Sequence, residues 1–221
     1  MNLGTGIIGE TGLQYFGKMS ALISHEIKNV LAIINENAGL LEDYTMMAEK
    51  GMPIDSKRLK TASGKIMAQI QRAERIIKNM NKFAHSVDEN IRAIDLSEVI
   101  DLVVALSAKF ISMHNVKIEL NPTLEQVNIT TSPFFIENLL WRCLNFAVDS
   151  IGQGETISIM VEEMEKGAEI KFTGIQDIGD SQPDSFPGDA EKALLKTLKA
   201  EVKTDLMCGE LRLSFPKDIT Q

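Results

Sequence analysis

Residues 20–31 read SALISHEIKNVL, a stretch that sets polar side chains into the middle of an otherwise apolar helical pattern. Around it, apolar residues recur at spacings of three and four, which predicts one long amphipathic helix from about residue 11 to residue 50. The apolar seam consists of Met19, Ile23, Ile27, Val30, Ile34, Ala38 and Leu41. At about 100° per residue, His25 lies about 200° from Ile27 and therefore points away from this seam. Asn29 follows one turn later on the face of His25, and Glu26 lies on the flank beside it.

A second helix is predicted after the turn GMPID at residues 51–55. Gly51 and Pro53 favour the turn, and Asp55 or Ser56 can cap the helix that follows. A second apolar series then runs from Leu59 to Val87, so the two helices form an antiparallel hairpin. Because one hairpin buries two long seams only in part, we expect a homodimer through residues 11–88, as a four-helix bundle. Packing of the hairpin on the C-terminal half of its own chain is the alternative.

From residue 95 onward the sequence pattern changes from long helices to alternating helices and strands. Asp95 and Glu98 start a helix of about five turns. After it come short strands, a helix over about 132–151, two strands, a helix in 189–202 and a last strand. This order predicts an α+β layer with helices on one face of a sheet. We therefore expect two domains, a helical hairpin over 11–90 and an α/β sandwich over 91–221.

Composition excludes several classes of protein. The net charge of −8 is uneven, because residues 1–90 carry +1 and residues 91–221 carry −9, which argues against a nucleic-acid partner. The only cysteines, Cys143 and Cys208, lack the spacing of a disulfide framework or a zinc site, so we expect no metal and a reducing cytoplasm. The longest apolar runs fall far short of the roughly 20 residues of a membrane span, so no membrane partner is expected.

The polar residues of the first helix can perform phosphoryl chemistry as a set. A neutral histidine is a nucleophile near pH 7, and a neighbouring carboxylate can fix its tautomer or accept its proton. An amide one turn away can orient a water molecule or a phosphoryl oxygen. His25, Glu26 and Asn29 are therefore candidate catalytic residues for transfer through phosphohistidine or for hydrolysis of an acyl phosphate.

The run FGKMSALISHEIKNVL, followed by a second amphipathic helix, resembles the phosphorylated-histidine motif and dimerisation hairpin of two-component sensor histidine kinases. The resemblance implies that His25 takes the phosphoryl group, that Glu26 assists proton removal, and that Asn29 assists dephosphorylation of a receiver domain. Lys28 matches the basic residue common before the Asn and is an expected partner-binding residue. Val30 stands where the family usually has Pro, so the helix should be less bent there.

The order of elements in 91–221 also resembles the ATP-binding sandwich of these kinases, but its motifs do not follow. The family's Mg²⁺-binding Asn aligns with Phe146, which has no oxygen ligand to offer. A shifted register, in which Asn145 and Asp149 serve, stays open. Gly174 stands where the adenine-reading Asp would follow the strand, and Asp177 comes three residues late. We therefore expect weak or no ATP binding and no cofactor of the chain's own.

These observations favour a phosphotransferase that relays phosphoryl groups through His25 to or from response-regulator receiver domains, with Mg²⁺ supplied by the receiver. A separate sensor kinase is a further candidate partner. A groove formed by Phe16, Ala21 and Leu22 with the second helix would dock the receiver. One alternative is an ATP-dependent kinase core with a divergent nucleotide site, and another is a non-catalytic dimeric adaptor. A phosphatase role that depends on Asn29 lies between these.

Overall fold

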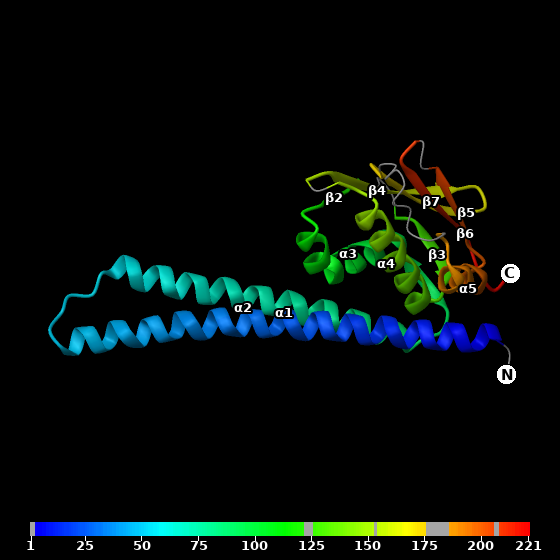
Figure 1. Cartoon of the computed structure of the whole chain (residues 1–221). Helices are drawn as coiled ribbons and strands as arrows, with labels where there is room; N and C mark the ends of the chain where they lie inside the picture. Colours follow the sequence, from blue (N-terminus) through cyan, green and yellow to red (C-terminus); the bar gives the residue numbers. More distant parts are fainter. Residues whose placement is uncertain (1–2, 122–125, 153, 176–185, 206–207) are drawn as a thin grey trace. The chain divides into compact units, whose positions relative to one another are not determined.

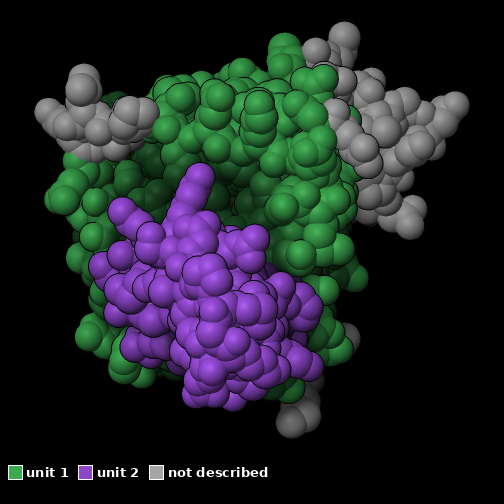
Figure 2. Space-filling view, turned by 90° about the vertical axis from the view of Figure 1, so that its left-hand side faces the viewer, with its two compact units in different colours: residues 1–18, 83–221 green, residues 19–82 purple. Residues whose placement is uncertain are grey.

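The computed structural model describes residues 3–121, 126–152, 154–175, 186–205 and 208–221. They form two compact units, one of residues 19–82 and one that combines residues 1–18 with residues 83–221 (Figure 2). The sequence pattern assigned residues 11–18 to the hairpin, whereas the structure groups them with the C-terminal part. The domain ranges 11–90 and 91–221 stay a prediction. Nowhere in these described ranges does a helix combine the length and the apolar character that crossing a membrane requires.

Two long helices dominate the first unit. Helix α1 (Leu3–Glu49) begins in the other unit and continues through this one, and α2 (Ser56–Ala84) returns after a short turn. Gly51, at φ 76°, adopts the left-handed conformation that favours glycine, and the Met52 amide donates to the Met47 carbonyl at 3.1 Å. Asp55 Oδ1 accepts from the Lys57 amide at 2.9 Å, which confirms the predicted cap.

The apolar seams of the hairpin are only partly buried. Met19, Ile23 and Val30 are buried on α1, and Ala62 is buried on α2. In contrast, large apolar side chains stay exposed along both helices: Leu31, Leu40, Met46, Met67, Ile70, Ile77 and Met80. One hairpin therefore leaves a substantial apolar surface in contact with water.

The second unit is an α/β sandwich, as predicted. Its elements are η1 (His85–Val87), β1 (Arg92–Asp95), α3 (Leu96–Met113), β2 (Lys117–Leu120), β3 (Asn128–Thr131), α4 (Pro133–Asp149), β4 (Thr156–Met164), β5 (Gly167–Thr173), α5 (Asp189–Leu198), β6 (Glu201–Asp205) and β7 (Glu210–Pro216). The main sheet has the order β2-β4-β5-β7-β6, with β2 parallel to β4 and the other pairs antiparallel. Strands β1 and β3 form a separate antiparallel pair.

Helices cover one face of the main sheet, and α3 and α4 lie side by side against it (Figure 1). Every second residue of β4 is buried there, as Ile157, Ile159 and Val161 show, and α4 contributes Leu139, Leu140 and Leu144 to the same core. Asp95 caps α3, because its Oδ1 accepts from the Ser97 amide at 2.9 Å.

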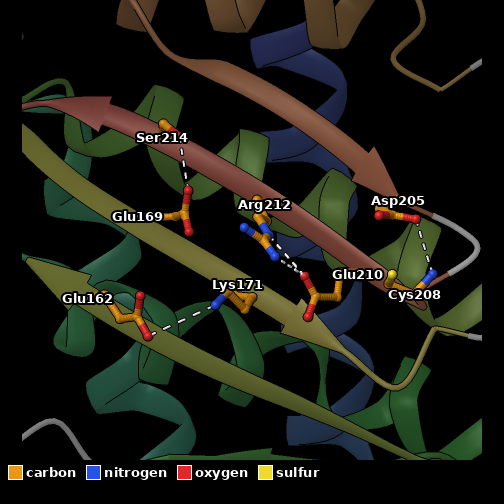
Figure 3. A network of polar contacts seen from close by, with 8 residues as sticks. All are labelled: Glu162, Glu169, Lys171, Asp205, Cys208, Glu210, Arg212 and Ser214. Atoms are coloured by element: carbon orange, nitrogen blue, oxygen red, sulfur yellow. Dashed lines mark hydrogen bonds and ion pairs between the residues drawn. The ribbon is translucent and has the colours of Figure 1, made fainter. Parts of the chain in front are cut away.

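The opposite face of the sheet carries charged and polar side chains, most of them half-buried (Figure 3). Lys171 pairs with Glu162 at 4.0 Å, Ser214 donates to Glu169 at 3.3 Å, and Arg212 pairs with Glu210. Isolated surface pairs of this kind contribute little to stability, typically less than about 1 kcal/mol. This face is a solvated layer of mixed charge.

An aromatic cluster joins residues from three segments of the second unit. Tyr15 is fully buried, and its ring centroid lies 5.5 Å from Phe83, 5.6 Å from Phe134 and 5.5 Å from Trp141. Asn138 adds a buried hydrogen bond to the carbonyl of Thr11 at 3.3 Å. The start of α1 is therefore part of the core of this unit.

Candidate active site

The polar set predicted from the first helix forms a small cluster on α1. Asn29 Nδ2 lies 3.2 Å from His25 Nδ1 and donates to Glu26 Oε1 at 3.4 Å. Glu26 Oε1 lies 3.9 Å from His25 Nδ1. Asn29 lies four residues after His25 and three residues after Glu26, and these two helical spacings bring its amide close to both side chains.

Exposure differs sharply within this cluster. The His25 side chain is 58% exposed, whereas the Glu26 side chain is 18% exposed. The polar contacts of the imidazole within the described part of the chain fall on Nδ1, so Nε2 is the ring nitrogen that an incoming group can reach. A solvent-accessible histidine with a carboxylate and an amide at its second nitrogen is suited to nucleophilic chemistry.

Arg72 is a member of this cluster that the sequence pattern did not predict. It lies on α2, and its guanidinium forms an ion pair with Glu26 Oε2. The two residues are 46 positions apart, so their proximity depends on the register of the hairpin. A prediction of Arg72 from the sequence requires the alignment of the two helices, because that alignment decides which basic residue of α2 lies opposite Glu26.

The expected docking residues occupy different environments. Ala21 and Lys28 are exposed and Leu22 is half-buried on α1, in the unit that carries His25. Phe16 belongs to the other unit, where its ring stacks on Phe83 with centroids 5.5 Å apart. There it lines an open apolar groove of about 480 Å³ with Ile8, Leu13, Val87, Phe134 and Phe135. Docking at these residues stays a prediction.

At the expected nucleotide site, the side chain of Phe146 has no oxygen ligand for Mg²⁺. Phe146 stacks face to face on Phe186, with centroids 4.3 Å apart and an angle of 15° between the rings. Asp149 pairs with His114 at 3.5 Å, and Asn145 Oδ1 is buried with no hydrogen-bond partner among the residues that the structure describes. Across the same residues, no three His, Cys, Asp or Glu side chains lie close enough together to hold a metal ion.

The backbone at Gly174 leaves no room for a side chain. Its φ is 91°, and a Cβ at this position would lie 2.4 Å from the carbonyl oxygen of Thr156. An aspartate cannot replace this glycine without a shift of the backbone. Asp177 lies outside the described residues.

Comparison with known proteins supports the fold. Neither a protein-family model nor a curated protein matches the sequence. Among solved structures, the chain is similar to the histidine kinase AdeS of Acinetobacter baumannii, with 13% identity, a TM-score of 0.50, and coverage of 87% of this chain and 98% of that one. A mycobacterial sensor histidine kinase, MprB, matches over 57% of this chain and 97% of its own, at 16% identity and a TM-score of 0.48.

The histidine kinase ThkA, solved in complex with the response regulator TrrA, matches over 93% of this chain and 63% of its own, at 17% identity and a TM-score of 0.47. At these identities a likeness concerns the fold. The chain therefore has the fold of the catalytic core of sensor histidine kinases, in agreement with the resemblance carried by residues 16–31.

Proposed function

We propose that this protein carries phosphoryl groups on His25 in two-component signalling and exchanges them with the receiver domain of a response regulator. The observation that carries the proposal is the exposed His25 whose Nδ1 faces Asn29 and Glu26. The fold supports it, because the similar AdeS structure is a histidine kinase. Fold alone does not determine activity, so the proposal rests on this site.

The source of the phosphoryl group divides the proposal into two candidates. In the first, the protein is a phosphorelay transferase and receives the group from a receiver domain that a separate sensor kinase has charged. The stacked Phe146 and the constrained Gly174 favour this candidate, because Phe146 has no oxygen ligand for Mg²⁺ and Gly174 has no carboxylate to bind adenine.

In the second candidate, the protein is an ATP-dependent kinase core with a divergent nucleotide site. The named solved structures that share its fold are kinases, so the comparison fits this candidate better than it fits a relay protein. Both candidates use His25 as the nucleophile and Glu26 and Asn29 as its neighbours.

The proposal includes a homodimer formed by the helical hairpin. The exposed apolar residues of α1 and α2 support it, because a second hairpin would remove them from water. In the proposed complex, receiver docking uses the exposed residues Ala21 and Lys28 near His25.

Two labelling reactions test the proposal. The protein is incubated with radiolabelled ATP and Mg²⁺, and separately with receiver domains of the organism's response regulators charged with radiolabelled acetyl phosphate. We expect acid-labile label from a receiver, lost in His25→Ala and retained in the control His85→Ala, since His85 is also exposed.

Each other outcome has a distinct meaning. Label on His25 from ATP alone establishes the kinase candidate. Absence of label with both ATP and the charged receivers contradicts the proposal and favours a non-catalytic adaptor.

A further inference from the structure

The structure points to Arg72 as a positioning residue, which holds the Glu26 carboxylate so that one of its oxygens faces the Nδ1 atom of His25. The inference rests on the proposed function and extends the site to the second helix. Nothing in the motif of residues 20–31 assigns a role to α2.

The two oxygens of Glu26 have separate partners. Oε2 pairs with the Arg72 guanidinium, whereas Oε1 accepts from Asn29 Nδ2 at 3.4 Å and lies 3.9 Å from His25 Nδ1. One guanidinium nitrogen of Arg72 makes this contact, and a charge-assisted hydrogen bond of this kind restricts the rotation of the carboxylate. With Oε2 held from α2, Oε1 stays on the side of the histidine.

This orientation matters because of the tautomer that the transfer needs. In the structure the Asn29 amide nitrogen faces Nδ1 at 3.2 Å, an arrangement that suits an imidazole with its proton on Nε2. Nε2 can attack only when it has a free lone pair, and the ring proton must then be on Nδ1. Glu26 Oε1 is the acceptor that stabilises this second tautomer, once the 3.9 Å separation closes to about 3 Å.

The transfer moves the phosphoryl group from an aspartate oxygen to a histidine nitrogen. Nε2 attacks the phosphorus of the receiver's aspartyl phosphate, and a P–N bond forms while the P–O bond to the aspartate breaks. The electron pair of that bond leaves with the aspartate carboxylate. The imidazole, now bonded to phosphorus and still protonated on Nδ1, is cationic, and its Nδ1 proton passes to Glu26 Oε1.

Exposure separates this ion pair from an ordinary surface contact. The Glu26 side chain is 18% exposed and that of Arg72 is 41% exposed, so the carboxylate is the more shielded of the two. Arg75 lies three residues further along α2, is exposed, and has the same charge. It is therefore a matched control for the loss of a positive charge from this helix.

The test uses the full chain and a receiver domain charged with radiolabelled acetyl phosphate, in single-turnover reactions. We expect Arg72→Ala to slow phosphorylation of His25 about tenfold, a fraction of the roughly 10²–10⁴-fold that a general base contributes. The receiver concentration at half-maximal rate and the melting temperature should stay at the wild-type values. Arg72→Lys should restore part of the rate, and Arg75→Ala should transfer at the wild-type rate.

A double variant shows whether Arg72 acts through Glu26. If it does, Glu26→Ala combined with Arg72→Ala transfers no more slowly than Glu26→Ala alone. Nitrogen NMR of ¹⁵N-histidine-labelled protein gives an independent readout, because the population of His25 with its proton on Nδ1 should fall in Arg72→Ala. A residue that only supports the fold would leave the tautomer ratio unchanged.

Two results would overturn the inference while the proposed function stands. One is a wild-type transfer rate in Arg72→Ala. The other is a double variant whose transfer rate falls by the product of the reductions in the two single variants. If the wild type takes its label from ATP, the same variants are compared with ATP as the donor. Failure of the wild-type protein to take label from either donor contradicts the proposed function itself.

Discussion

Glu137 is a carboxyl group that α4 places in the interior of the second unit. It is buried, and its Oε2 has no hydrogen-bond partner within the described residues. Burial raises the pKa of Glu137 to about 8, while a hydrogen bond with Ser86 and the charge of Arg92 act in the opposite direction. Tyr15 of α1 also faces it, and burial together with the charge of Glu137 raises the pKa of that phenol.

The raised pKa predicts that stability falls as the pH rises. The folded protein keeps the Glu137 proton up to about pH 8, whereas the unfolded chain loses it near the ordinary value of 4.5. The contribution of this group is therefore fully present below pH 4.5 and is lost as the pH rises towards 8, with an upper limit of about 5 kcal/mol. Urea unfolding of wild type and Glu137→Gln between pH 5 and pH 8 measures the effect.

Glutamine mimics the protonated acid and has no charge to lose. We expect the variant to gain stability relative to the wild type as the pH rises, by a few kcal/mol at pH 8. Glu162→Gln on the charged face of the sheet, where the side chain is 43% exposed, is the control and should leave the pH dependence unchanged. Parallel pH profiles for wild type and Glu137→Gln would contradict the prediction.

Single residues show how far the sequence could predict this site. His25, Glu26 and Asn29 could be grouped because helical geometry alone brings Asn29 close to the residues three and four positions before it. Arg72 could not, because its contact depends on how two helices align across a turn. Glu137 has the same limit, since its burial results from packing of segments that are distant in the chain.

Element boundaries were predictable where a local signal exists. Asp55 and Asp95 were expected as caps, and both accept the backbone hydrogen bond that a cap provides.

Strand β6 was missed, because residues 200–202 continue the apolar pattern of α5. The helix ends at Leu198, and Lys199, at φ 49°, turns the chain into the strand. Strand β1 was missed because its four residues depend on pairing with β3.

The hairpin predicts a dimer at the scale of its helices. Ile70 and Ile77 are seven residues apart on α2 and stay exposed, so they occupy equivalent positions of an uncovered seam. We expect the wild-type protein to have twice the 24.5 kDa mass of the chain in light scattering coupled to size exclusion. Ile70→Glu with Ile77→Glu should convert it to the monomer, because the dimer would bury two charges on each chain.

Lys78→Glu is the matched control for this experiment. It changes the net charge by the same amount on the same helix, at an exposed polar position, and should leave the dimer intact. A wild-type mass of one chain at all concentrations would exclude the hairpin interface.

At the scale of the whole molecule, the first helix belongs to two units. Residues 1–18 join residues 83–221, and residues 19–82 form the hairpin that carries His25. Tyr15 is the anchor of the first segment, since its buried ring contacts Phe83, Phe134 and Trp141. Aromatic pairs of this kind each add about 0.5–1.5 kcal/mol beyond the area that they bury. The sandwich is therefore incomplete without a segment that precedes the hairpin in sequence.

This arrangement predicts complementation in trans. A fragment of residues 83–221 lacks Tyr15 and exposes the apolar surfaces of Phe83 and Phe134, so we expect it to melt below the transition of the same unit in the full chain. A peptide of residues 1–18 should raise its melting temperature, with a stabilisation of about 2.7 kcal/mol at a hundred times the dissociation constant. The free peptide has five glycines among its 18 residues and is not a stable helix by itself, so binding includes the cost of ordering it. The same peptide with Tyr15→Ala should have little effect, because it keeps the length and charge and removes the anchoring ring. Equal melting of the fragment with and without the wild-type peptide would show that residues 1–18 are not a structural part of the sandwich.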